Sequence, residues 1–172
     1  GEVFNFQPLR QVLEEAGHRF RSHSDTEVIL HAYEQWGESC VDYLRGMFAF
    51  AIWDTREGKL FAARDRLGIK PLYYHLERKN GQTRLLFGSE LKTLLSSGLI
   101  EPRINLAALH HYLSFYAVPA PYTILEGVQA LPAGHHMTFH EGRLTVTRYW
   151  DVPVGEPLTG SEDEIIQRLR AL

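Results

Sequence analysis

The sequence predicts an α+β fold in which a largely antiparallel sheet has helices on one side and a second sheet on the other. Segments with the apolar spacing of helices stand before and after a series of short strand-like segments. The longest of these, residues 46–54, is apolar on both faces, as strands are when both faces are covered. A layered sandwich of helices and two sheets satisfies both observations.

Two helices are expected before this strand. Residues 8–16 carry apolar side chains at helical spacing behind a proline, and Gly17 suits the position after the last turn. Ser24 and Glu27 then fit the capping box S-x-x-E, which marks the start of a second helix ending at Gly37. The apolar face of this second helix comprises Val28, Ile29, Ala32, Tyr33 and Trp36.

Short apolar runs and turn-like loops predict the strands. Residues 46–54 alternate between two faces, Phe48, Phe50 and Ile52 on one and Met47, Ala49, Ala51 and Trp53 on the other. Further strands are expected at residues 60–63, 72–76, 85–87, 137–139 and 144–149. Loops 54–58, 79–81 and 140–143 are short enough for hairpins, so the sheet is expected to be largely antiparallel.

The remaining helices follow the central strands. Gly88-Ser89-Glu90 opens one helix, and residues 105–115 have the pattern of another. Residues 152–160 are rich in proline and glycine, which is typical of a linker. Ser161 and Glu164 then form another capping box, which predicts that a last helix begins there.

Composition narrows the class of protein. The 172 residues carry a net charge of −3 and are 44% apolar, which describes a soluble globular protein without the basic surface of a nucleic-acid binder. The sequence contains no run of 18 apolar residues, so no membrane association is expected. Cys40 is the only cysteine, which excludes an intrachain disulfide, and we interpret it as a structural residue rather than a nucleophile.

The histidines do not predict a metal site. His110 and His111 point about 100° apart on a helix, and His135 and His136 point to opposite faces of a strand. His136 and His140 share a face but lie roughly 13 Å apart, too far for one ion. We therefore expect no metal ligands in this chain.

A fixed order of motifs is the most specific feature of the sequence. Residues 46–95 read as a strand, a turn, a strand ending in Arg64-Asp65, the segment GIKPLYY, and a Gly-Ser-Glu that opens a helix. The chain also begins with Gly1-Glu2-Val3-Phe4-Asn5. Both features resemble the glutaminase domain of glutamine-hydrolysing asparagine synthetases, which are class II glutamine amidotransferases. The resemblance implies a four-layer αββα sandwich of the N-terminal nucleophile hydrolase type, incomplete at its N-terminus, so that the chain begins partway through the domain.

The same resemblance implies three site residues. Gly1 matches a glycine whose backbone N–H helps to form the oxyanion hole, and Glu2 matches a neighbouring glutamate that contacts the substrate. Asp25 matches an aspartate that accepts a hydrogen bond from the α-amino group of glutamine, although an acidic residue in a first helical turn also simply complements the helix dipole. The nucleophilic cysteine and the R-H-R-G-P arginine of the family are absent. Residues 64–72 are interpreted as scaffold.

The implied domain organisation is a partial amidotransferase domain at residues 1–150, a linker at 151–160 and the start of a synthetase domain at 161–172. The expected partners are glutamine and that synthetase domain, with a homodimer left open, and the expected location is cytoplasmic. No phosphate-binding loop occurs, so ATP and Mg²⁺ are expected to bind in the synthetase domain and no cofactor in this chain. Two alternatives remain: a ligase relative such as a β-lactam synthetase that hydrolyses no glutamine, and a non-enzymatic interaction or dimerisation protein.

Overall fold

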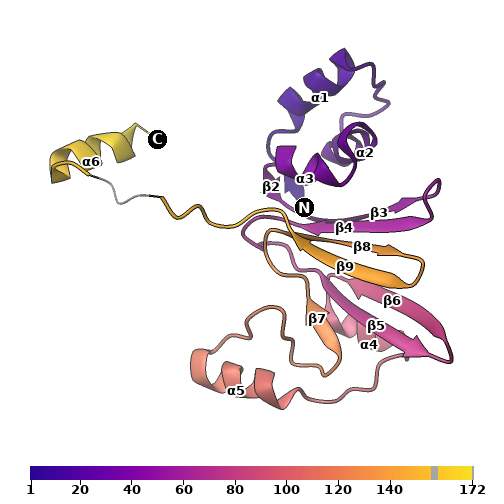
Figure 1. Cartoon of the computed structure of the whole chain (residues 1–172). Coiled ribbons are helices and arrows are strands. Elements are labelled where there is room, and N and C mark those ends of the chain that lie inside the picture. The colour runs from indigo at the N-terminus through magenta and orange to yellow at the C-terminus, as the bar shows by residue number, and fades with distance from the viewer. Residues whose placement is uncertain (156–158, 172) are drawn as a thin grey trace.

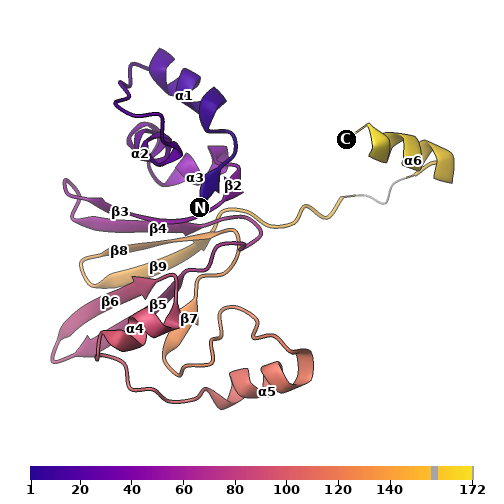
Figure 2. The same ribbon diagram turned by 180° about the vertical axis from the view of Figure 1, so that it is seen from behind.

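Four layers stack in the order helix, sheet, sheet, helix (Figure 1). The computed structural model describes residues 1–155 and 159–171. The first layer consists of α1 Phe6–Glu15, α2 Asp25–Trp36, the 3-10 turn η1 Gly37–Ser39 and α3 Cys40–Tyr43. The last layer consists of α4 Leu91–Ser96, with α5 Leu106–Phe115 beyond it (Figure 2). The αββα prediction is confirmed.

The sheet next to the first helices has four antiparallel strands in the order β3-β4-β8-β9. Its strands are β3 Ala49–Asp54, β4 Lys59–Arg64, β8 His135–His140 and β9 Arg143–Arg148. Glu141 and Gly142, which connect β8 to β9, both have positive φ angles, as a tight two-residue hairpin turn requires. The hairpins predicted around loops 54–58 and 140–143 are therefore present, and the pairing of β4 with β8 joins them into one sheet.

The second sheet has three antiparallel strands in the order β6-β5-β7. These are β5 Tyr73–Lys79, β6 Gln82–Gly88 and β7 Val128–Ala130. Asn80 and Gly81 form the predicted turn between β5 and β6, again with positive φ angles. A separate pair, β1 Glu2–Val3 and β2 Gly46–Met47, lies beside the first helices.

Three apolar clusters hold the layers together. The largest lies between helices α1 to α3 and the four-stranded sheet, and it includes Leu13, Val28 and Phe61. A second cluster, centred on Leu131 and Met137, joins the two sheets. The third packs Leu94, Ile100, Leu125 and Val128 between the second sheet and α4. Each interface excludes water from apolar surface, which is the main free-energy gain of the layered arrangement.

The prediction of one strand over residues 46–54 is wrong in two respects. The predicted strand is divided into β2 and β3 by a break at Phe48. At this residue the backbone forms hydrogen bonds with Asp65 instead of with a neighbouring strand. The second face of the strand is also partly uncovered, since Ala51 is exposed and the Trp53 side chain is 57% exposed. The first face agrees with the prediction, because Phe48, Phe50 and Ile52 all belong to the helix-facing core.

The capping box predicted at the start of α2 is also wrong. The Ser24 hydroxyl accepts a hydrogen bond from the backbone of Thr26, at 3.1 Å, but the Glu27 carboxylate does not return to the N-cap. Instead it accepts bonds from the backbone N–H groups of Arg21 and Ser22, both at 2.7 Å, and from the Ser22 hydroxyl. The loop before the helix folds back over the first turn and offers donors that compete with the cap.

The C-terminal helix, α6 Glu162–Arg170, begins with the predicted capping box of Ser161 and Glu164. Figure 1 shows it apart from the layered body. The predicted linker at residues 151–160 is extended where it is described, and its residues 156–158 lie outside the described part. Helix α1 begins two residues before its predicted start, and Gly17 follows it with a φ of +98° as expected. Within residues 1–155 and 159–171, no helix is both long and apolar enough to cross a membrane.

Candidate functional site

The first residues of the chain are fixed against β2. Glu2 pairs with Met47 and Val3 with Gly46. Both glycines of this segment are required by the close approach of the two strands. A Cβ atom on Gly46 would overlap the Glu2 carbonyl, and one on Gly1 would lie 2.9 Å from the Met47 carbonyl oxygen. The backbone around Gly1 and Glu2 is therefore held in one position by pairing and by the lack of side-chain space.

Asn5 anchors the other end of this segment. Its side-chain amide donates to the carbonyl oxygen of Tyr43 and accepts from the N–H of Arg45, both at 2.9 Å. The backbone N–H of Phe4 adds a bond to the Arg45 carbonyl at 2.8 Å. An asparagine amide can donate and accept at once, so it ties the segment to the loop after α3. Sequence reasoning did not identify this role, because the two partners lie far from Asn5 in the chain.

Asp25 brings the second predicted element to the same place. As the first residue of α2, it accepts a hydrogen bond at its Oδ2 atom from the backbone N–H of Val3, at 2.9 Å. Its Oδ1 atom has a contact of 3.5 Å with the Ser24 hydroxyl. One of the two carboxylate oxygens thus holds β1 against the start of α2. Gly1 and Glu2 are exposed and Asp25 is half-buried.

Asp65 organises the loop beneath the site. It is fully buried, and its carboxylate accepts bonds from the backbone N–H groups of Phe48, Leu67, Ile69 and Lys70 at 3.3, 3.1, 2.9 and 2.9 Å. A buried carboxylate needs such donors to replace its lost hydration. The connection from β4 to β5 is therefore wound around one side chain, which also holds the start of β3.

The Arg64 guanidinium acts in the same way on backbone carbonyl groups. It donates to Gly68 and Lys70, both at 2.7 Å, and to Leu131 at 2.6 Å. The first two carbonyls belong to the crossover from the first sheet to the second, and the third belongs to the return crossover. Arg64 therefore fastens both crossovers between the sheets, which agrees with the interpretation of residues 64–72 as scaffold.

Cys40 is placed where it cannot act as a nucleophile. Its side chain is fully buried in the core between the helices and the four-stranded sheet. Burial, with a smaller effect of the Asp42 charge, raises the pKa of the Cys40 thiol to about 12. Because the thiolate is the reactive form, Cys40 is unreactive at neutral pH.

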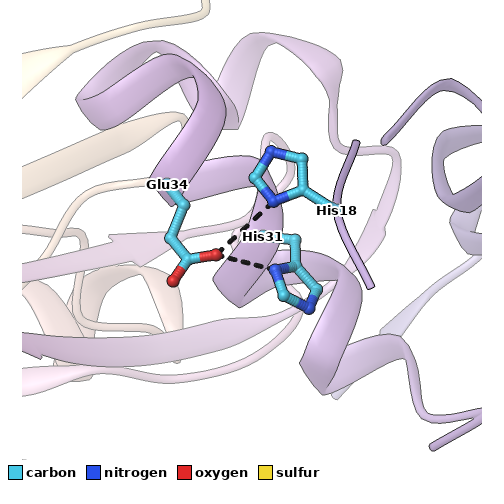
Figure 3. Close-up of side chains that lie close together, drawn as sticks. All are labelled: His18, His31 and Glu34. Atoms are coloured by element: carbon cyan, nitrogen blue, oxygen red, sulfur yellow. Dashed lines mark hydrogen bonds and ion pairs between the residues drawn. The ribbon is translucent and has the colours of Figure 1, made fainter. Parts of the chain in front are cut away.

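A second group of polar side chains lies away from this site. His18, in the loop after α1, meets His31 and Glu34 of α2 (Figure 3). One ligand atom of each residue lies within 4.8 Å of the other two. Sequence reasoning missed the group because His18 reaches the helix only through the tertiary fold. The spacing of His31 and Glu34 at i and i+3 was the available signal.

Comparison with known proteins gives the class of this chain. The family model for the glutamine amidotransferase domain matches residues 1–150, so the chain belongs to that family. Asparagine synthetase [glutamine-hydrolyzing] 3 of Bacillus subtilis is 42% identical over 173 residues, which cover 100% of this chain and 27% of that protein. Amidase chry2 of Gibberella zeae is 33% identical and is matched over 99% of this chain and 25% of its own length.

Solved structures agree on the fold. Glutamine phosphoribosylpyrophosphate amidotransferase of B. subtilis superposes with a TM-score of 0.53, over 86% of this chain and 27% of that chain, at 20% identity. The allosteric regulatory enzyme of purine biosynthesis superposes with a TM-score of 0.58 over the same shares, also at 20% identity. This chain thus spans about a quarter of the length of the relatives just described.

Proposed function

We propose that this chain forms part of the glutaminase domain of a longer, glutamine-hydrolysing asparagine synthetase. The observation that carries the proposal is the position of Asp25, whose carboxylate bonds Val3 at 2.9 Å and so stands beside Gly1 and Glu2. The identity of 42% to an asparagine synthetase over the whole chain supports the choice of enzyme.

In the proposed reaction, a cysteine thiolate supplied from outside these residues adds to the side-chain amide carbon of glutamine. The backbone N–H of Gly1 stabilises the oxyanion. The α-amino group of the same cysteine, which has taken the thiol proton, gives it to the amide nitrogen, so that ammonia leaves as the thioester forms. Water then cleaves the thioester to give glutamate. The Oδ1 atom of Asp25 accepts a hydrogen bond from the α-ammonium group of the substrate, and Glu2 contacts the substrate from the same side. Cys40 takes no part.

The ammonia is proposed to react with a β-aspartyl adenylate that a synthetase domain makes from aspartate and ATP with Mg²⁺. The outer face of α5 is the surface that we assign to this domain. Leu106, Leu113, Phe115 and Tyr116 are between 69% and 86% exposed there, and Leu109 and Tyr112 of the same helix line a cavity of about 650 Å³. An apolar patch of this kind is typical of a surface that another domain covers.

A second candidate follows from the similarity to an amidase, which shows that the domain also occurs in a protein of another name. In this alternative the domain binds no glutamine and supports amide chemistry on a different substrate. In one version of this alternative, the whole protein is a ligase similar to a β-lactam synthetase. In the other version, it is a non-enzymatic interaction or dimerisation protein. The two classes of function differ in whether glutamine is hydrolysed.

The test joins the N-terminal segment of the B. subtilis relative, beginning at its nucleophilic cysteine, to this chain. We expect glutamate release from glutamine, and loss of that release when the added cysteine is replaced by alanine. A folded protein that releases no glutamate and binds no glutamine in calorimetry would contradict the proposal and favour the second candidate.

A further inference from the structure

The group of His18, His31 and Glu34 joins the loop after α1 to the middle of α2 (Figure 3). Atom Oε2 of Glu34 lies 2.7 Å from Nδ1 of His31 and 3.5 Å from Nδ1 of His18. The two imidazole rings are 5.0 Å apart and tilted by 53°, so both Nδ1 atoms can face one point. A carboxylate oxygen and two imidazole nitrogens converge in this way in zinc sites.

The other nitrogen of His18 faces Gln35. Nε2 lies 3.0 Å from Oε1 of Gln35, and this contact is a hydrogen bond in the tautomer that carries its hydrogen on Nε2. In the neutral ring, Nδ1 then presents its lone pair toward the Glu34 carboxylate. Two acceptors that face each other at 3.5 Å repel unless a proton or a metal cation lies between them.

His31 is oriented by a corresponding contact. Its Nε2 atom lies 3.7 Å from Oε1 of Glu27, and the Phe20 ring meets the imidazole edge-on at 4.5 Å. Glu27 is itself fixed by three hydrogen bonds from residues 21 and 22. A histidine that directs one nitrogen to a carboxylate and the other to the site is the usual arrangement of a metal ligand.

We propose that His18 Nδ1, His31 Nδ1 and Glu34 Oε2 bind one Zn²⁺ ion, with a water molecule as the fourth ligand. Zinc bonds of about 2.0–2.2 Å require ligand atoms a little over 3 Å apart, which small side-chain rotations provide here. Both histidines are largely buried, whereas Glu34 is 49% exposed, so the open coordination position is on the solvent side. That side borders a cavity of about 580 Å³ that His18 and Glu34 help to line.

The ion would act as a clamp between the loop at residues 17–24 and α2. Zn²⁺ is the metal chosen because two nitrogens and one carboxylate suit it better than Mg²⁺ or Ca²⁺, which prefer oxygen ligands. The site is separate from Asp25 and β1, and the proposal does not depend on glutamine hydrolysis.

The test is a titration of the chelator-treated full chain with Zn²⁺, followed by calorimetry, and with Co²⁺, followed by visible absorption. We expect one equivalent of Zn²⁺ to bind and to raise the melting temperature, and Co²⁺ to give the intense bands of tetrahedral coordination. Because Glu34 is half-exposed, Glu34→Gln keeps the fold and is expected to abolish the cobalt bands. Gln35→Leu, which frees the His18 tautomer, is expected to weaken Zn²⁺ binding by about 10–100-fold.

His140→Gln is the matched control, since this exposed histidine lies on the β8–β9 hairpin. It is expected to bind Zn²⁺ as the parent does. Binding that Glu34→Gln leaves unchanged, or an absence of tetrahedral cobalt bands in the parent, would overturn the proposal. The group would then be an ion pair between an imidazolium and a carboxylate only.

Discussion

Cys40 is the residue whose chemistry is decided by its position in the fold. Its thiol is buried, and its pKa of about 12 leaves almost no thiolate at neutral pH. We therefore expect the 172-residue chain alone to release no glutamate from glutamine. The measurement is an enzymatic glutamate assay on the purified chain. Turnover that Cys40→Ala abolishes would contradict this expectation and identify Cys40 as a nucleophile.

Asp65 is the residue on which the scaffold depends most. An asparagine at this position has one acceptor oxygen in place of two and turns an amide group toward backbone donors. We expect Asp65→Asn to lower the free energy of unfolding by about 3 kcal/mol, since bonds to a charged acceptor contribute about 1.5–3 kcal/mol each. Urea denaturation measures this loss. Asp151→Asn at the exposed end of the domain is the control, and an equal loss in both variants would show that Asp65 has no special role.

At the residue scale, sequence reasoning identified Asp25, Gly1, Glu2 and Arg64 but not the bonds that they make. The contact of Asp25 with Val3 joins positions 22 residues apart, and no spacing rule predicts it. His18 was missed for the same reason. The family motifs therefore supplied residues whose roles in the site stay predictions, whereas the fold determined what Asp25 and Arg64 contact.

At the scale of elements, the start of α2 carries a pH-dependent contribution to stability. Hydrogen bonds from the Ser22 side chain and the Arg21 backbone lower the pKa of Glu27 from 4.5 to about 2. The unfolded chain thus binds a proton at a higher pH than the folded one. The contribution of Glu27 to the free energy of unfolding is complete above the pKa that Glu27 has in the unfolded chain. It is lost as the pH falls through the folded-state pKa of about 2.

We expect Glu27→Gln to remove this contribution. Its free energy of unfolding should be lower than that of the parent at neutral pH, and it should fall less steeply between about pH 4.5 and pH 2. Urea unfolding at a series of pH values, with chelator present to exclude metal effects, provides the comparison. Parallel curves for the two proteins over this range would show that the Glu27 bonds do not persist in solution.

The elements differed in how well the sequence predicted them. Helices α1, α2 and α5 were found because their apolar faces repeat over several turns. Strands β1, β2 and β7 were not found separately, since two or three residues show no periodicity. At the start of α2 the N-cap Ser24 was predicted correctly, but the return bond of the capping box does not form, because the Glu27 carboxylate accepts bonds from the preceding loop instead. Long periodic elements are thus predictable, and short elements set by distant partners are not.

At the scale of the whole molecule, β3 is an exposed sheet edge with an apolar face. Trp53 is 57% exposed, and strand edges of this kind tend to pair with other chains. We expect the isolated chain to self-associate through β3. Size-exclusion chromatography at several concentrations, with hydrogen exchange on residues 46–54, measures this association.

Two variants identify the surface involved. Trp53→Lys places a charge on the β3 edge and should favour the monomer, whereas Leu113→Lys on the α5 face should leave the association unchanged. A monodisperse parent protein with strong protection at residues 46–54 would contradict the expectation and favour a self-sufficient, non-catalytic domain. Association reduced only by Leu113→Lys would assign it to α5 instead.

The central claim is that the Asp25 carboxylate binds the α-ammonium group of glutamine beside Gly1 and Glu2. Asp25→Asn tests it most directly, because the asparagine oxygen can still accept the bond from Val3 while the negative charge is lost. In the protein supplied with its nucleophilic segment, we expect KM for glutamine to rise about tenfold to a hundredfold, as loss of a charge-assisted bond worth about 1.5–3 kcal/mol predicts. An unchanged KM in a folded, active variant would reduce Asp25 to an acidic residue that complements the α2 dipole, and the account of the site would be wrong.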